Sequence, residues 1–500
     1  MEMFLSAVQM LLTYGSLLAI LLGVASGIII GALPGLGAVL AITMALPLTF
    51  VLPKEASIAL LLGLYCGSTY GGSISAILIN TPGTPASAAT VLDGYPMARA
   101  GHADLALGWS TTASAIGGII AALILAMAAP LLAKVGLLFG PVEYFALGLF
   151  ALTCIVSVAR EDIVKGLLAG LAGLFIAVIG QDPLTGDMRF DFGSFDLAAG
   201  VGLVPFLVGL FALSEVFWRM AEHDPKAEAK IMRAGFRMPG WSELKLRAGV
   251  LLKSSLIGTW IGTLPGIGAT TAAMVSYAEA KRTSPRRDKF GTGEPDGIIA
   301  SESANNAVTA GALIPTLSLG VPGDPITAVM LGALTLQGIT PGPRLFTESG
   351  ELVIFIFIAL VVANIVMFAC GAALAPLFTR ILRIPEPLMM TCVVVLIALG
   401  TYSINSSSFD LLIVFISGVA GFLLRYNGFP LPPIVIGFVL CPMIEQSMRQ
   451  GLIITDNSFL AFFSYPIALG LFVVTLLFLV WPFIRDRWEK SKATKADNVS

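Results

Sequence analysis

The sequence has few charged residues and few ionisable groups of the kinds that enzymes use. Of its 500 residues, 12% are charged and 56% are hydrophobic, and the mean hydropathy is +0.90. Soluble domains carry roughly 25% charged residues, so this chain lacks the polar surface that a globule of its size needs. These values predict an integral membrane protein. The net charge of -2 indicates no particular partner, and we expect no nucleic-acid binding.

Signatures of enzymes and metal sites are also missing. The two histidines, His102 and His223, stand in no metal-ligand spacing and make a Ser–His protease a poor fit. The sequence contains neither the GxxxxGK[ST] motif for nucleotide phosphates nor the HExxH motif for zinc. The five cysteines are scattered in apolar segments, which favours small buried residues over disulfides. We therefore expect a protein that is not an enzyme and has no cofactor.

What the chain has instead is glycine and proline inside long apolar runs. The segment Gly27–Ala38, GIIIGALPGLGA, returns as Gly258–Ala269, GTWIGTLPGIGA, with eight of twelve positions identical. Glycine and proline are poorly suited to the interior of a helix. Pro34–Gly35 and Pro265–Gly266 therefore predict the turn of a helical hairpin in each half of the chain.

A second pair of interruptions follows in the same order. Thr81–Pro85, TPGTP, aligns with Val321–Pro325, VPGDP, at an offset of 240 residues, whereas the first pair is offset by 231. A longer loop between the two motifs of the second half explains the difference. Interrupted apolar segments in matching positions of two halves are typical of a transporter's substrate site. We expect two broken membrane helices at these points.

The fold class that follows is an all-α polytopic membrane protein. We expect two inverted-topology repeats with re-entrant hairpins and broken helices, arranged as in elevator-type carriers. The first membrane repeat covers residues 1–218, a cytoplasmic linker 219–247, the second membrane repeat 248–484 and a cytoplasmic tail 485–500. Apolar runs predict further spans near Leu105–Leu132, Tyr144–Val158, Ile163–Gly180, Leu197–Trp218, Val353–Phe378, Leu388–Tyr402, Leu411–Leu424, Pro433–Ile454 and Phe459–Trp481, with a polar loop at Arg99–Asp104.

The basic residues predict the orientation, because cytoplasmic loops of membrane proteins are rich in Lys and Arg. This rule places the linker, the tail and Lys281–Lys289 in the cytoplasm and the acidic stretch Asp182–Asp196 outside. Counting spans puts Arg425 on the cytoplasmic side as well. On this hypothesis, residues 190 and 286 lie on opposite faces of the membrane.

Polar side chains around the interruptions are candidates for substrate contacts. A broken membrane helix leaves backbone groups that lipid cannot satisfy, so the break faces protein, water or ligand. The N-termini of half-helices suit carboxylates. Packing of helices through small residues is the alternative interpretation. The candidates for substrate binding are Ser68, Thr69, Ser73, Asn80, Thr81, Gly83, Thr84, Asn305, Asn306, Ser318, Gly323, Asp324 and Thr327.

A second group of residues is expected to support the site or to hold an ion, with Na⁺ bound through backbone carbonyl groups. It consists of Pro34, Gly35, Gly37, Pro265, Gly266, Gly268 and Glu302. Asp324 either binds a coupling cation or proton, or caps the half-helix that starts after it. Glu302 and Asp93 are expected near the water interface. Lys253 is expected to extend its amine to the cytoplasmic face.

The motifs resemble a known family. The paired LPGxGA segments, the stretch Tyr65–Gly101 and the stretch Glu302–Pro343 are similar to the large membrane subunit of the tripartite tricarboxylate transporters, the TctA family. The resemblance covers nearly the whole chain. It implies a bacterial inner-membrane secondary transporter that imports a di- or tricarboxylate with a gradient of Na⁺ or H⁺. It also implies two partners, which are a small four-helix membrane subunit and a periplasmic solute-binding protein.

Two other classes of function remain open from the residues alone. The first is a carrier or channel for another small solute that works without a binding protein. The second is a membrane scaffold or an intramembrane enzyme. The duplicated helix breaks argue against a scaffold, which gains nothing from them, and no nucleophile–base pair supports an enzyme.

Overall fold

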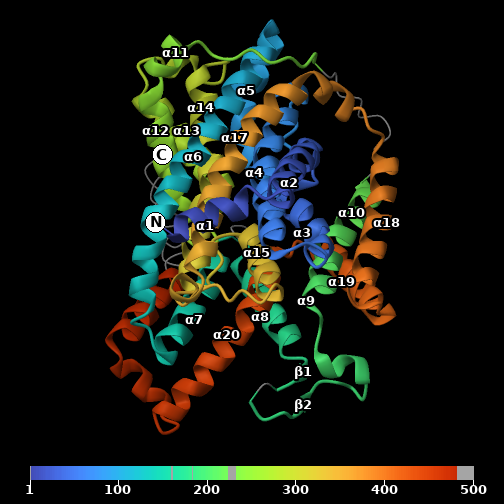
Figure 1. The fold of residues 1–500 in the computed structure, drawn as a ribbon, viewed down its shortest axis with the longest axis vertical. Helices are drawn as coiled ribbons and strands as arrows, with labels where there is room; N and C mark the ends of the chain where they lie inside the picture. Colours follow the sequence, from blue (N-terminus) through green and yellow to red (C-terminus); the bar gives the residue numbers. More distant parts are fainter. Residues whose placement is uncertain (1, 159–161, 183, 223–231, 481–500) are drawn as a thin grey trace, which may run out of the picture.

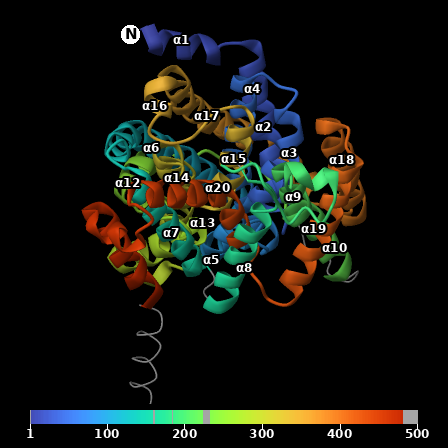
Figure 2. The same cartoon turned by 90° about the horizontal axis from the view of Figure 1, so that it is seen from below.

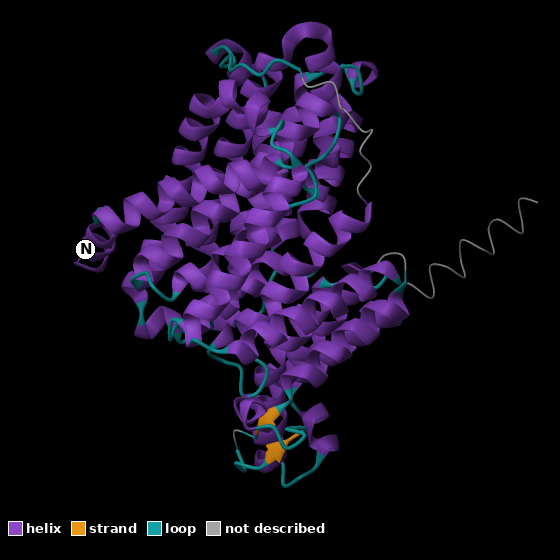
Figure 3. Ribbon diagram, turned by 90° about the vertical axis from the view of Figure 1, so that its right-hand side faces the viewer, coloured by secondary structure: helices purple, strands orange, loops and turns teal. Residues whose placement is uncertain are grey.

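The computed structural model describes residues 2–158, 162–182, 184–222 and 232–480. The expected tail 485–500 and part of the linker lie outside these ranges. The regular secondary structure of the described part is helical except for one antiparallel ribbon of β1 (Gly180–Gln181) and β2 (Met188–Arg189) (Figures 1 and 3). Among the described residues, seven helices are long and apolar enough to cross a membrane. The structure thus agrees with a polytopic membrane protein.

The helices occur close to the expected spans. In the first half they are α1 (Glu2–Leu11), α2 (Tyr14–Ala32), α3 (Gly37–Thr49), α4 (Lys54–Ile79), α5 (Ala88–Met97), α6 (Ala103–Gly136), α7 (Pro141–Val158), α8 (Ile163–Ala177), α9 (Leu203–Leu207) and α10 (Ser214–Glu222). In the second half they are α11 (Trp241–Leu246), α12 (Ala248–Gly262), α13 (Gly268–Thr283), α14 (Pro295–Leu319), α15 (Pro325–Leu336), α16 (Leu345–Glu348), α17 (Gly350–Ile381), α18 (Glu386–Asn405), α19 (Ser408–Tyr426), α20 (Pro432–Ile454) and a last helix over Pro466–Val480.

The prediction of a polar loop at Arg99–Asp104 is wrong. A π-helical turn, Ala98–His102, joins α5 directly to α6, and the chain changes direction at Gly101, where φ is 94°. Only glycine adopts such a φ readily, so this residue allows a sharp bend within helical backbone. The polar residues of this stretch therefore belong to a helical corner at the end of the molecule.

The centre of the molecule consists of α4 and α14. Every residue from Ala56 to Leu78 in α4, and from Asp296 to Ser318 in α14, is buried. A helix that is surrounded on all sides needs no amphipathic pattern, which explains why both helices lack one apolar stripe. Helices α2, α6, α12 and α17 pack around this pair, as Figure 2 shows from below.

Glycine allows α2 to lie directly against α4 and α12 against α14. A Cβ atom on Gly31 would lie 2.3 Å from the carbonyl oxygen of Ser68, and one on Gly258 would lie 2.3 Å from that of Ala304. The two helices of each pair run parallel, because the sequence separation between contacting residues stays constant along the contact. In the first pair, Gly23, Gly27 and Gly31 each contact a residue 37 positions later. In the second pair the separation is 46 positions. The two separations differ by the same nine residues as the offsets of the sequence motifs.

Different segments of the chain form the two ends of the molecule. The described linker residues 232–247 cross the end that carries α5 and α11 (Figure 1), and there the amide of Arg237 donates to the carbonyl of Asp104 at 3.1 Å. Arg286 lies at this end too, 3.3 Å from Asp296. The β1–β2 ribbon, which Phe190 directly follows in the sequence, protrudes from the opposite end. Residue 286 and the ribbon are therefore at opposite ends of the molecule, and their placement on opposite faces of the membrane stays a prediction.

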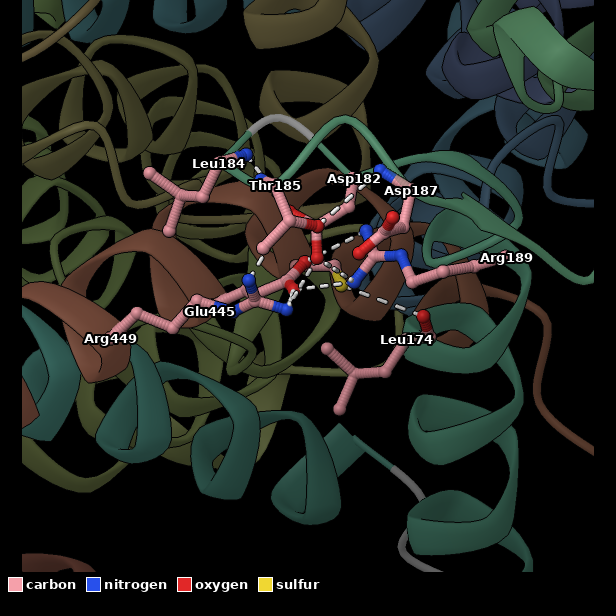
Figure 4. Close-up of polar contacts among 9 residues, drawn as sticks. Leu174, Asp182, Leu184, Thr185, Asp187, Arg189, Glu445 and Arg449 are labelled. Carbon is pink, nitrogen blue, oxygen red and sulfur yellow. Dashed lines mark hydrogen bonds and ion pairs between the residues drawn. The ribbon is translucent and has the colours of Figure 1, made fainter.

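A four-residue ionic cluster attaches the ribbon to α20 (Figure 4). Arg449 lies 2.8 Å from both Asp182 and Glu445, and Arg189 lies 2.5 Å from Glu445. Asp182 also accepts hydrogen bonds from the amides of Leu184, at 2.8 Å, and Thr185. The Leu184 amide and Arg449 lower the pKa of Asp182 to about 2, because both stabilise the carboxylate.

Candidate functional site

Each LPGxG motif forms the tip of a helical hairpin. The chain reverses between α2 and α3 at Leu33–Leu36, and between α12 and α13 at the matching position. The first and third residues after Leu-Pro have positive φ, at Gly35 (81°), Gly37 (64°), Gly266 (80°) and Gly268 (71°). Positive φ is strained for other residues, so the two glycines of the motif are required by the turn itself.

The backbone follows the same kind of path at both interruptions. Helix α4 ends at Asn80 with φ of 60°, and α14 ends at Gly320 with φ of 71°. The chain then turns back along its own helix, and the amide of Gly83 donates to the carbonyl of Gly72 at 3.1 Å. The next helical segments thus begin beside the middle of α4 and α14. The predicted break is a reversal of the chain rather than a gap within one straight helix.

Both new helical segments begin with a capping box. Before the 3₁₀ turn Pro85–Ser87, which continues into α5, the amide of Thr84 donates to the hydroxyl of Ser87 at 3.2 Å. Before α15, Asp324 accepts a hydrogen bond from the amide of Thr327 at 2.7 Å. Asp324 therefore caps α15, which was one of the two roles that the sequence left open.

Asp324 has a second partner that the sequence did not reveal. The hydroxyl of Tyr65, on α4, donates to the other carboxylate oxygen of Asp324 at 2.5 Å. Both residues are buried. The pair joins the first half of the chain to the second at the start of α15. No pattern around Tyr65 distinguishes it from a packed aromatic residue.

The four repeated motifs surround one cavity of about 580 Å³. Much of its wall consists of pairs of residues from the two halves of the chain. In some pairs the partners are 240 positions apart in the sequence: Tyr65 and Asn305, Thr69 and Thr309, Thr84 and Asp324, Pro85 and Pro325, and Ala86 and Ile326. In others they are 231 positions apart: Leu36 and Ile267, Gly37 and Gly268, and Ala38 and Ala269. Matching positions in the sequence thus face each other across the same space.

One part of the wall has no such pairing. It consists of Phe211, Glu215, Arg425 and the segment 429–432. Arg425 forms an ion pair with Glu215 and lies 4.2 Å from the ring centre of Trp218. Arg425 therefore lines the cavity, which the distribution of basic residues in the sequence did not predict. An isolated arginine at the end of an apolar segment was the available signal.

Glu215 connects Arg425 to the first hairpin tip. Its second oxygen lies 2.9 Å from Arg219, one helical turn further along α10. Arg219 in turn donates a hydrogen bond to the carbonyl oxygen of Pro34. The second tip is held differently, because the amide of Gly266 donates to the carbonyl of Gly323 at 2.9 Å.

The structure brings some of the candidate residues to the cavity. These are Thr69, Thr84, Asn305, Asp324, Gly37, Gly266 and Gly268. Asn305 donates to the carbonyl of Thr69 at 3.3 Å, and its buried Oδ1 accepts no hydrogen bond from the described residues. This oxygen is available to a ligand that brings its own donor.

The other candidates lie elsewhere. Asn80 and Thr81 are exposed at the end of α4. Ser68, Ser73 and Ser318 donate to carbonyl groups of their own helices, and Asn306 donates to the carbonyl of Ser114. Gly83 and Gly323 pack against helix backbone, Thr327 belongs to the cap of α15, and Pro34, Gly35 and Pro265 lie in the hairpin tips.

Three charged residues have partners that the sequence did not predict. Glu302 is 0% exposed in the centre of the molecule, so its expected place near the water interface is wrong. Asp93 is equally buried, and it accepts hydrogen bonds from the hydroxyl of Tyr277 at 2.8 Å and from three backbone amides of the segment 291–294. Lys253 pairs with Glu279 at 2.5 Å, on the outside of the second hairpin.

Comparisons with known proteins identify the family. The family model described as "Tripartite tricarboxylate transporter TctA family" matches residues 17–436. The "Uncharacterized 52.8 kDa protein in TAR-I ttuC' 3'region" of Agrobacterium vitis is 38% identical over 94% of this chain and 94% of its own length. The "Uncharacterized protein in TAR-II ttuC' 3'region" of the same organism is 35% identical over 46% of this chain and 96% of its own length.

No solved structure matches the chain. The family match covers most of the sequence, including both LPGxG motifs and both interruptions, and the Agrobacterium vitis relative extends the similarity to nearly the whole length. Members of this family are the large permease subunits of tripartite tricarboxylate transporters, and are transporters rather than enzymes. This chain is a multi-pass membrane protein that belongs to the tripartite tricarboxylate transporter TctA family.

Proposed function

We propose that the protein imports a di- or tricarboxylate, or a related organic acid, across the bacterial inner membrane with the energy of an ion gradient. The family membership supports transport of this class of solute. The observation that carries the proposal is the convergence of all four repeated motifs on one central cavity. Inside the membrane, backbone N–H and C=O groups that lack helical hydrogen bonds are tolerated only where they face protein, water or ligand.

The carboxylate group binds at the start of the segment Pro85–Met97. This helical start is capped by the neutral residues Thr84 and Ser87, so the partial positive charge of the helix is not offset by an acid. Asn305 and Thr69 line the same cavity and supply polar groups for a second part of the solute. Arg425 supplies a guanidinium group from the part of the wall that has no counterpart in the other half, where its ion pair with Glu215 offsets part of its charge.

The start of α15 has the opposite electrostatic character. Asp324 places a carboxylate where the helix N-terminus would otherwise attract an anion. A carboxylate of the solute therefore prefers the Thr84 side, while hydroxyl groups of the solute can approach Asp324. The mixed lining suits a solute that carries both kinds of group.

We further propose that the two halves of the chain are inverted repeats. Three features support this: the matching offsets, the parallel α2–α4 and α12–α14 pairs, and the opposite directions of α4 and α14 where they meet. Along the contact, Thr69 lies beside Asn305, and further along α4 Ser73 lies near Glu302, so residue numbers rise on one helix and fall on the other.

The repeats suggest an elevator-type movement. The hairpins α2–α3 and α12–α13 and the reversed segments move together, and helices such as α18–α20 remain fixed in the bilayer. A crosslink between Pro82 and a fixed helix must then stop transport. Uptake that continues with Pro82 locked to such a helix contradicts the movement.

The two partners follow the family pattern. A small four-helix membrane subunit binds beside the permease, and a periplasmic solute-binding protein delivers the carboxylate to it. Basic segments at the α11 end favour a cytoplasmic location for the linker and the C-terminus. A carrier that works without a binding protein is the second candidate, and it predicts full uptake by this chain alone.

Uptake by proteoliposomes tests the proposal. The chain is reconstituted with its two partner subunits, and radiolabelled citrate, other di- and tricarboxylates and a neutral sugar are compared under imposed gradients of Na⁺ or H⁺. We expect uptake of at least one carboxylate, dependent on one gradient and on the binding protein. Uptake that ignores both gradients excludes secondary transport, and uptake of the sugar alone excludes the carboxylate.

A further inference from the structure

Glu302 is a fully buried acid that the cavity does not use. It lies on α14, three residues before Asn305, so the two share one face of the helix a single turn apart. Its exposed fraction is 0%. A carboxyl group in the interior of a membrane protein is costly and is therefore a functional hypothesis by default.

The surroundings of Glu302 consist of hydroxyl groups. Thr90, on α5, donates to one carboxylate oxygen, and Ser114, on α6, donates to the other at 2.9 Å. The hydroxyls of Ser73 and Ser110, 2.8 Å apart, are also within reach of the carboxyl group. Four hydroxyls from three neighbouring helices thus surround one acid.

Glu302 differs from Asp324 and Asp93 because its hydrogen-bond partners among the described residues are hydroxyls alone, whereas those two acids accept from a hydroxyl and also from backbone amides. Asp324 accepts from a backbone amide, and Asp93 accepts from three, and an amide can only donate. Such donors stabilise the carboxylate alone. A hydroxyl both donates and accepts, so the same four groups can serve a carboxylate or a carboxylic acid after rotation.

The charged and titratable groups around Glu302 leave it without a cation. Tyr70 of α4 faces it, with its hydroxyl bonded to Thr111 at 2.7 Å. Asp93 of α5 is bonded to Tyr277 of α13, and Lys253 of α12 is paired with Glu279. Near Glu302, the described residues of α6 and α17 contribute hydroxyl groups and the side-chain amide of Asn364. No ion pair involves Glu302 among the described residues.

We propose that Glu302 is a proton-binding site that couples proton movement to movement of the solute. This inference rests on the proposed function and names its coupling ion. Glu302 takes one proton from water on one side of the membrane, becomes a carboxylic acid, and returns the same proton to water on the other side. Thr69 and Asn305 at the cavity wall, one turn from Ser73 and Glu302, connect the acid to the cavity.

Infrared spectroscopy tests the site directly and requires neither solute nor partners. The carbonyl stretch of a protonated carboxyl group is recorded for the full chain in lipid nanodiscs across about pH 5 to pH 9. We expect a band that disappears as pH rises in the wild-type protein and is missing in Glu302→Gln. It must persist in Glu351→Gln, which changes an exposed glutamate bonded to Ser6.

A second variant keeps the test decisive if Glu302→Gln fails to fold. Ser114→Ala removes one hydroxyl donor and retains the acid, so we expect the midpoint of the band to move upward by about one pH unit, the effect of one hydrogen bond to a charged group. A band that is independent of both substitutions overturns the proposal. A band that shifts with added NaCl at constant pH also overturns it, in favour of Na⁺.

The result is separable from the test of transport. If the band titrates but the proteoliposomes take up no carboxylate, the proposed function is wrong and the proton site stands. If uptake is driven by a gradient but the band does not depend on Glu302, the proton site is wrong and the proposed function stands.

Discussion

The starts of the segments Pro85–Met97 and α15 have the same backbone design and differ in charge. Each follows a helix that ends in left-handed conformation, each reverses along that helix, and each begins with a capping box. Thr84 is neutral, however, and its counterpart Asp324 is an acid bonded to Tyr65. The comparison teaches that geometry is matched in the two halves, while the side chains give each half a different electrostatic role.

The hairpin tips differ in the same way. Both turns depend on glycine at positive φ. The first tip is bound by Arg219, from α10, which lies outside the hairpins, and the second is bound by the backbone of its own reversed segment. A movement of the first hairpin relative to α10 must break the contact with Pro34. The second hairpin and its reversed segment can move as one unit.

The largest expected effect comes from making the two helix starts alike. Thr84→Asp places a carboxylate at both, and like charges brought together in an interface cost several kcal/mol. We expect carboxylate uptake by the reconstituted system to fall by about 100-fold or more. Thr84→Ser, which retains the hydroxyl, must remain near the wild-type rate. Normal uptake by Thr84→Asp means that the solute does not bind at this helix start.

Arg425 tests the part of the cavity wall that has no counterpart. Arg425→Gln removes the positive charge, and the loss of a hydrogen bond to a charged group raises KM for the carboxylate by about 10- to 100-fold. Arg425→Lys retains the charge without the planar fork and gives an intermediate KM. Lys165→Gln is the matched control, because Lys165 donates to the nearby carbonyl of Asn427 and does not line the cavity. Equal effects of Arg425→Gln and Lys165→Gln exclude a specific role for Arg425.

The Tyr65–Asp324 hydrogen bond gives a smaller effect, on stability. Tyr65→Phe leaves a buried carboxylate oxygen without its donor, which costs about 1–3 kcal/mol. We expect a lower melting temperature in detergent for Tyr65→Phe. In the Asp324→Asn background the same substitution has a different effect, because the two residues interact directly. Strictly additive shifts in the double variant contradict the hydrogen bond.

The smallest effect concerns the ribbon at the far end of the molecule. The folded-state pKa of Asp182 is about 2, below its ordinary value, so its stabilising contribution is complete above about pH 4 and is lost as pH falls toward 2. We expect the amides of Leu184 and Thr185 to be more protected from hydrogen exchange than in Asp182→Asn at about pH 5. The difference must vanish near pH 2. A difference that is constant across this range means that Asp182 does not titrate there.

The sequence predicted the parts of the structure that depend on backbone. Glycine and proline at matching offsets predicted the hairpin tips and both interruptions, because few other residues adopt the φ values that these turns require. It also predicted the long apolar helices. It missed the helical corner at Gly101, where a glycine bends helical backbone instead of ending it.

Side-chain partners between distant segments were not predictable in this way. The hydrogen bond between Tyr65 and Asp324 spans 259 positions of the sequence, and the hydroxyls around Glu302 come from three helices. Their position before Pro82 predicts Asn80 and Thr81 at the site, but the chain reverses there and carries Thr84 to the cavity instead. Direction of the chain after a break is set by tertiary packing, which the local sequence does not encode.

Protection of cysteines by the solute shows whether both halves of the chain line one carboxylate site. Cys66, Cys154, Cys370 and Cys441 are replaced by alanine, and exposed Cys392 is kept as an internal control. Ala38→Cys and Ala269→Cys, which occupy matching positions of the cavity wall, are then introduced one at a time. We expect the transported carboxylate to slow labelling of both introduced cysteines and to leave labelling of Cys392 unchanged. Normal uptake with no protection at either position would contradict it.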